Sequence, residues 1–139
     1  SPSSENVPGA RIGAVGWFDS STQEFWLFGG YAYINTSSKE VDSCSTNNPI
    51  NIRVVIGYMN DLWRYKVSDD KWTWMGGTDT TNHPGVYGEK GVANTAFIPP
   101  SRSNAIGWYD HSTQELWLFG GNGITGTHHS SVYLQMKQI

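Results

Sequence analysis

The stretch RIGAVGWFDSSTQEFWLFGG, residues 11–30, occurs a second time as RSNAIGWYDHSTQELWLFGG, residues 102–121. About two thirds of the paired positions are identical, and every pair is separated by the same 91 positions, as Gly16 and Gly107 are (107 − 16). Self-similarity at a fixed offset is typical of repeat architectures, in which each unit buries its apolar face against a neighbouring unit. The chain therefore contains two copies of one structural unit.

The composition favours short strands joined by tight turns. Charged residues make up 15% of the 139 residues, whereas the chain holds 7 Trp, 7 Tyr and 16 Gly. Disordered chains lack aromatic residues, and aromatic residues punctuated by glycine are typical of all-β domains. A net charge of −3 argues against general nucleic-acid binding, and the lack of a long apolar run predicts no membrane span.

The first copy predicts four strands, and the second copy predicts three. In the first copy we expect strands at residues 11–18, 24–30, 61–67 and 70–76. In the second copy we expect them at 102–109, 115–121 and near 131–139. The run EFWLFGG, residues 24–30, is apolar without alternation, so it predicts a strand that is buried on both faces and ends at Gly29-Gly30.

The LFGG sequence at residues 27–30, followed by NDLWRYKVSDDKW at 60–72, resembles the kelch repeat. The hallmarks of that repeat are a Gly-Gly pair after an apolar run and a spaced Tyr and Trp, and here Tyr65 precedes Trp72 by seven residues. The segment GVYGEKGVANTAFIPPSR also resembles the blade-to-blade connection of large kelch-repeat proteins of the galactose oxidase central-domain type. This resemblance implies an all-β fold built of four-stranded antiparallel propeller blades.

The resemblance also implies a division of the chain and a set of structural positions. Within a partial propeller spanning 1–139, residues 7–76 form a complete blade with an insert at 31–60, residues 77–101 connect the blades, and 102–139 form a second blade without its fourth strand. The motif positions are Gly29, Gly30, Tyr65, Trp72, Gly120 and Gly121. Arg11 and Arg102 either point toward the central channel or form an ion pair within the blade, and the ion pair is the preferred reading.

About one and three-quarter blades do not make a closed propeller, which has about four to eight. Three alternatives remain open. The chain is a piece of a longer propeller, or several copies assemble into a ring or filament, or it is an open array inside a larger complex.

The strand order places every long connection on the same side of the blades, because antiparallel strands alternate their links between two sides. The long connections are residues 31–60, 77–100 and 122–130, and we expect this long-loop face to bind a partner. The candidate binding residues are Tyr31, Tyr33, Tyr58, Tyr87, Asn122, His128 and His129. Aromatic rings with a polar tip suit protein or glycan surfaces, although simple strand packing is the alternative for Tyr31 and Tyr58. Two adjacent histidines without a nearby acidic or cysteine ligand predict no metal site.

Asn35-Thr36-Ser37 matches the acceptor pattern for N-glycosylation, so Asn35 is the expected glycosylation site if the protein is secreted by a eukaryote. Cys44 is the single cysteine, so a disulfide within the chain is impossible.

The sequence carries no nucleophile elbow, phosphate-binding loop or recognisable carboxylate pair, and it predicts no cofactor. We therefore expect a non-catalytic interaction or structural module, located outside the cell or at its surface. Its partners are expected to be protein or glycan, or further propeller blades from the same longer chain or from other copies. The alternatives are a piece of a carbohydrate-active kelch-propeller enzyme and an intracellular, cytoplasmic kelch adaptor.

Overall fold

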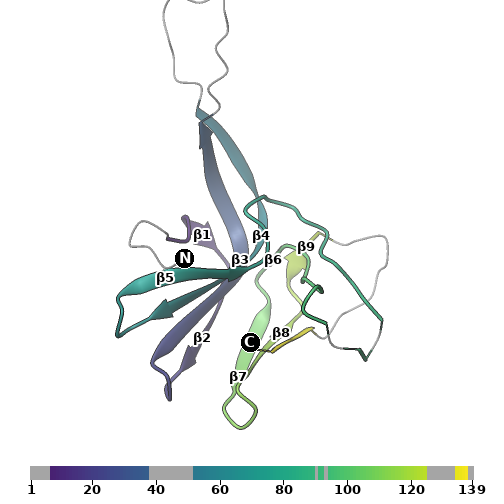
Figure 1. Cartoon of the computed structure of the whole chain (residues 1–139). Helices are drawn as coiled ribbons and strands as arrows, with labels where there is room; N and C mark the ends of the chain where they lie inside the picture. Colours follow the sequence, from purple (N-terminus) through teal and green to yellow (C-terminus); the bar gives the residue numbers. More distant parts are fainter. Residues whose placement is uncertain (1–6, 38–51, 90, 93, 125–133, 138–139) are drawn as a thin grey trace, which may run out of the picture.

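The computed structural model describes residues 7–37, 52–89, 91–92, 94–124 and 134–137. Over these residues the chain is all-β, with antiparallel sheets, none of them closed, and no helix (Figure 1). The described part accordingly offers no helical segment of the length and apolarity that a bilayer crossing requires. The all-β prediction is confirmed.

Two larger sheets and one two-stranded pair make up the fold. The first sheet contains β1 (Arg11–Ile12), β2 (Val15–Asp19), β3 (Glu24–Ser37), β4 (Ile52–Lys66) and β5 (Lys71–Gly76). The second sheet contains β7 (Ile106–Asp110), β8 (Glu115–Phe119) and β10 (Leu134–Lys137). The remaining pair joins β6 (Arg102–Ser103) to β9 (Asn122–Gly123).

The two copies have the same strand register. Trp17 lies opposite Trp26 in the first sheet, and Trp108 lies opposite Trp117 in the second, 91 positions further along. The short pairs match as well, since β1 meets β3 at Arg11 and Ala32 as β6 meets β9 at positions 102 and 123. The repeated sequence therefore specifies the same backbone pairing twice.

The predicted strand 11–18 is wrong in one respect, because it is divided in two at Gly13. This residue has a φ of 64°, which a residue with a side chain rarely adopts, and its carbonyl accepts a hydrogen bond from the Asn104 amide (2.7 Å). The chain turns here, so that β1 and β2 pair with separate parts of β3.

The prediction of a loop over 31–60 is wrong at both ends. β3 continues past Gly29-Gly30 to Ser37, and β4 begins at Ile52, so the two strands project from the first sheet as a ribbon (Figure 1). The glycines, with φ of 62° and 102°, accommodate a shift in register instead of ending the strand. The ribbon is rich in β-branched and aromatic residues, which favour strands even where the overall composition is polar.

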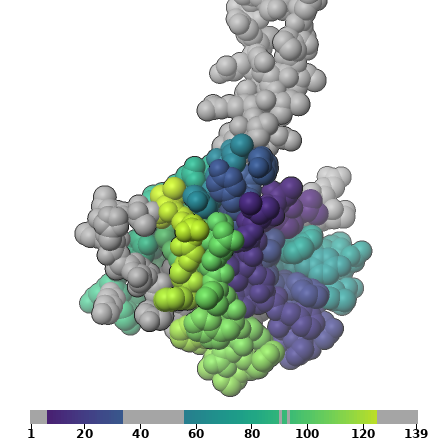
Figure 2. Space-filling model, turned by 180° about the vertical axis from the view of Figure 1, so that it is seen from behind, coloured from purple at the N-terminus to yellow at the C-terminus, as the bar shows by residue number. Residues whose placement is uncertain are grey.

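The core lies between the two sheets, which pack side by side (Figure 2). Its buried residues are Val15, Trp17, Trp26 and Phe28 from the first sheet and Leu116 and Leu118 from the second. The prediction that residues 24–30 are buried on both faces is wrong, since Phe25 is 44% exposed. The second sheet covers one face of β3 and leaves this residue on the other.

Candidate functional site

Each sheet has two faces of contrasting composition, because side chains alternate along a strand. The tryptophan face consists of Val15, Trp17, Trp26 and Phe28 in the first sheet, and of Ile106, Trp108, Trp117 and Phe119 in the second. The glycine face consists of Gly16, Phe18, Phe25 and Leu27 in the first sheet, and of Gly107, Tyr109, Leu116 and Leu118 in the second. The two copies therefore repeat both faces almost residue for residue.

The tryptophan face of the first sheet packs on the glycine face of the second. The Trp17 indole donates a hydrogen bond to the Trp117 carbonyl (3.2 Å) and lies over Gly107. A Cβ at Gly107 would come within 2.4 Å of Val15 Cγ1 and 2.7 Å of Trp17 Nε1. A glycine is thus required at this point for the indole to approach the strand so closely.

A polar cluster stands at one end of this interface. Asp19 is buried and accepts hydrogen bonds from the Ser21 amide (2.9 Å), the Ser21 hydroxyl (2.6 Å) and the Thr22 hydroxyl (2.8 Å). Burial alone would raise the pKa of Asp19, but the hydrogen bonds outweigh it and hold the pKa well below its usual value. Burial, together with the nearby Asp19 carboxylate, raises the pKa of Tyr109 to about 12.

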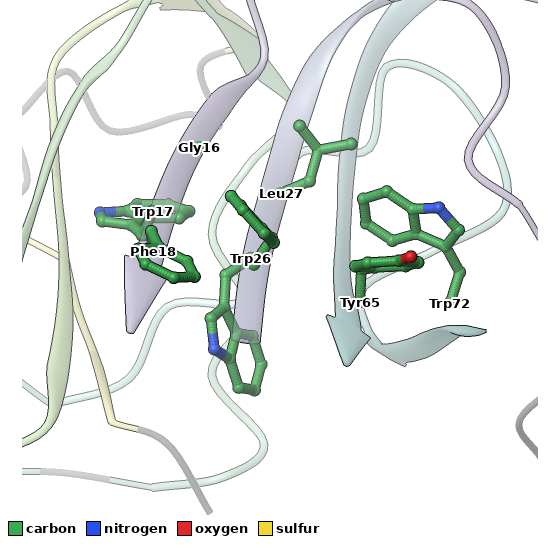
Figure 3. Close-up of a pocket in the computed structure, with 8 residues that line it drawn as sticks. Gly16, Trp17, Phe18, Trp26, Leu27, Tyr65 and Trp72 are labelled. Carbon is green, nitrogen blue, oxygen red and sulfur yellow. The ribbon is translucent and has the colours of Figure 1, made fainter. Parts of the chain in front are cut away.

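The glycine face of the first sheet is open. With Tyr65 and Trp72 it lines an apolar depression of about 570 Å³ (Figure 3). Phe18, Phe25, Tyr65 and Trp72 follow one another across four strands, with ring centroids 4.5, 6.3 and 5.3 Å apart. This row of aromatic rings is an exposed apolar surface of the kind that marks interaction sites.

The tryptophan face of the second sheet is also exposed. Ile106 is 66% exposed and Trp108 is 45% exposed, and Trp108 is stacked on Trp117 with ring centroids 5.5 Å apart. The equivalent of Trp108 in the first sheet, Trp17, is 5% exposed. The same residue type in the same register is thus covered in one copy and uncovered in the other.

Arg11 forms an ion pair within the first sheet. Its guanidinium donates two hydrogen bonds to the Asp61 carboxylate (2.6 and 2.9 Å) and one to the Gly29 carbonyl (2.9 Å). The Trp63 indole donates a further bond to Asp61 (2.6 Å). The Tyr65 hydroxyl donates a hydrogen bond to Asp70 in the β4–β5 turn (2.6 Å). These residues hold the sheet together.

The tyrosines predicted to bind a partner do not form one cluster. Tyr31 and Tyr58 face each other across the ribbon, with ring centroids 5.1 Å apart in an edge-to-face arrangement. Tyr33 is 55% exposed on the same ribbon, whereas Tyr87, 43% exposed, belongs to the connection between the two copies.

The loop positions predicted for Asn35 and Asn122 are wrong. Asn35 is on β3, opposite Val54 of β4, and Asn122 begins β9, opposite Ser103. Both segments pair because a neighbouring strand continues beside them. His128, His129 and Cys44 lie outside the described residues.

An incomplete propeller exposes the broad faces of its blades, so open faces are expected from the sequence. Which face of each sheet is open was not predicted, although a signal for it exists. Gly16 and Gly107 occupy the middle of equivalent strands, where glycine is unfavourable unless something packs closely against it.

Among the described residues, no three His, Cys, Asp or Glu side chains gather as a metal site would require. Comparison of the chain with protein-family models, curated proteins and solved structures gave no match.

Proposed function

We propose that the chain is a non-catalytic kelch-type interaction module, in which the two sheets are propeller blades and the exposed faces bind further blades. One observation carries the proposal. The tryptophan face of the first sheet covers the glycine face of the second, and the chain exposes another copy of each face.

Exposure separates the equivalent positions sharply. Leu116 on the covered glycine face is 1% exposed, while its equivalent Phe25 is 44% exposed. Trp17 and Trp108 differ in the same way on the tryptophan faces, at 5% and 45%. Large exposed aromatic surfaces of this kind are uncommon on monomeric proteins and mark places where another protein binds.

The open glycine face has room for an incoming tryptophan. A Cβ at Gly16 would have the Trp26 carbonyl oxygen as its nearest neighbour, 3.7 Å away, so the space above this glycine is empty. The Trp26 carbonyl is the equivalent of the Trp117 carbonyl, which accepts the Trp17 indole N–H (3.2 Å). An indole from another blade can therefore repeat both the close approach and the hydrogen bond.

Such a contact joins two different faces, so it is head-to-tail. Head-to-tail contacts build a ring if the rotation closes and a filament if it does not. The occupant can come from a longer chain or from another copy, and protein is therefore the partner class favoured by the apolar faces. The long-loop face, with Tyr33 and Tyr87 exposed, is the second surface in the proposal. The proposal includes a location outside the cell or at its surface, and glycosylation of Asn35 would support that location.

Replacing Trp108 by Ala tests the proposal on this chain. Docking would reduce the exposure of Trp108 from 45% to the 5% of Trp17, which removes about 100 Å² of a side chain of about 250 Å² from water. At about 25 cal/mol per Å² this is worth about 2.5 kcal/mol, or a roughly 70-fold weaker self-association.

Sedimentation equilibrium over a dilution series measures that change. Val92→Ala is the control, because Val92 is 50% exposed but belongs to neither face, and it should leave association unchanged. Equal association of the two variants, or a wild-type chain that stays monomeric at every concentration, would rule out docking of copies through these faces.

A further inference from the structure

Arg11 and Arg102 are equivalent residues whose guanidinium groups are held in the same way. In each, Nε donates to the carbonyl two residues earlier, and Nη1 donates to the carbonyl of the first glycine of the Gly-Gly pair. The distances are 3.0 Å (Gly9) and 2.9 Å (Gly29) for Arg11, and 3.2 Å (Pro100) and 2.8 Å (Gly120) for Arg102. The backbone thus presents both guanidinium groups in one orientation.

The two arginines differ in what lies opposite them. Arg11 binds the Asp61 carboxylate with two hydrogen bonds, and the two side chains are 8% and 5% exposed. No carboxylate of a described residue forms an ion pair with Arg102. Within the part of the chain that the structure describes, the guanidinium that is paired in the first copy thus has no such partner in the second.

The strand register explains the difference. Glu24 lies opposite Lys66 in the first sheet, and Glu115 lies opposite Lys137 in the second, so Lys66 and Lys137 are equivalent. Counting back along the sequence, the position of Asp61 corresponds to 132, a valine outside the described residues, and no Asp or Glu occurs from 124 to 139. The third strand of the second copy therefore cannot supply the carboxylate.

Arg102 is partly removed from water, so its positive charge is less stable without a carboxylate partner than a fully solvated charge would be. The side chain is half-buried, and this burial lowers the pKa of Arg102 below its usual value. Tyr87, in the connection between the copies, is near enough to act electrostatically on Arg102. Arg102 itself is only partly buried, so part of the side chain is open to solvent. A partly desolvated cation gains from a carboxylate more than a solvated cation does.

We propose that Arg102 binds an Asp or Glu side chain of a protein partner. The Arg11–Asp61 pair is the model for this contact. It shows that a guanidinium held in this orientation donates two parallel hydrogen bonds to a carboxylate. This site does not depend on the docking of blade faces.

NMR of the arginine Nε–H resonances tests the inference on the unmodified chain. Acetate is the first probe, titrated at constant ionic strength against chloride. The Arg102 resonance should shift and reach saturation, while the Arg11 resonance should not move, because its carboxylate partner is already present. Equal responses of the two arginines, or a shift of Arg102 that never saturates, would overturn the proposal.

Two variants and two further probes sharpen the result. For the variants, which have no arginine Nε–H group at position 102, acetate binding is followed through the backbone amide resonances around that position. Arg102→Lys keeps the charge but loses the planar fork, so acetate should bind at least 10-fold more weakly. Arg102→Gln should abolish the response, and if that variant does not fold, the lysine variant still decides. An Asp residue blocked at both ends should bind Arg102 more tightly than glucuronate does. If glucuronate binds more tightly, the proposed protein partner is wrong and the site fits an acidic sugar.

Discussion

A methyl group added at Gly107 should destabilise the chain, whereas the same group added at Gly16 should not. At Gly107 the new Cβ would lie 2.4 Å from Val15 Cγ1 and 2.7 Å from the Trp17 ring, which is closer than packed atoms allow. At Gly16 the nearest atom would be 3.7 Å away, an ordinary contact. The two substitutions therefore differ in packing and in little else.

The expected size of the difference follows from these distances. Overpacking a well-packed core costs about 1–3 kcal/mol. Alanine in a strand is favoured over glycine by about 0.5–1 kcal/mol, and this gain applies to both variants. The free energy of unfolding of Gly107→Ala should therefore lie about 1–3 kcal/mol below that of Gly16→Ala.

Urea unfolding followed by tryptophan fluorescence, at a concentration low enough to prevent self-association, measures both variants. Gly16→Ala should match or exceed the wild type in stability, yet it should self-associate more weakly because the methyl group fills the seat of an incoming indole. Equal unfolding midpoints for the two variants would show that the packing of Trp17 does not require a glycine at position 107. The inference that Gly16 provides a seat for a second tryptophan would then fail.

Asp61→Asn leaves the buried Arg11 guanidinium without its counter-charge, so the free energy of unfolding should fall by about 3–5 kcal/mol; a loss under 1 kcal/mol in urea titration would contradict this. Because hydrogen bonds lower the pKa of Asp19, its contribution to stability is present above the ordinary value of 3.8 and declines as pH falls below it. Asp19→Asn should flatten that acid limb in unfolding curves. Because the pKa of Tyr109 is raised to about 12, its contribution is present below pH 10 and is lost as pH rises toward 12. Tyr109→Phe should remove the loss over that window, and an unchanged alkaline limb would show that another group causes it.

Much of the fold could be predicted from the sequence, because the same stretch occurs twice and must form the same local structure in both places. The shared text at 11–30 and 102–121 predicts two equivalent hairpins, and β2–β3 and β7–β8 have the same register. The ribbon could not be predicted. Gly29-Gly30 looks like a strand end, and only pairing with a distant partner, β4, shows that β3 continues.

The candidate sites depended on similar long-range information. Gly107 is covered and Gly16 is uncovered because of where the second sheet lies. No local sequence pattern predicts that position. That the third strand of the second copy offers Arg102 no carboxylate is recognised only when the pairing of β10 with β8 fixes the register of that strand. The tyrosines were predicted from residue type and from their place on the long-loop face, and Tyr31 and Tyr58 contact each other within the ribbon.

The central claim is that a tryptophan face of one chain docks on a glycine face of another, and a mixing experiment tests it most directly. Trp108→Ala removes the incoming indole, and Gly16→Val blocks its seat in a place where the present chain leaves room. Each variant alone should have the mass of one chain, 15.4 kDa, by light scattering. Their mixture should form a 1:1 complex and stop there, because each chain keeps one intact face. No increase in mass on mixing, or wild-type association by either variant alone, would contradict the account.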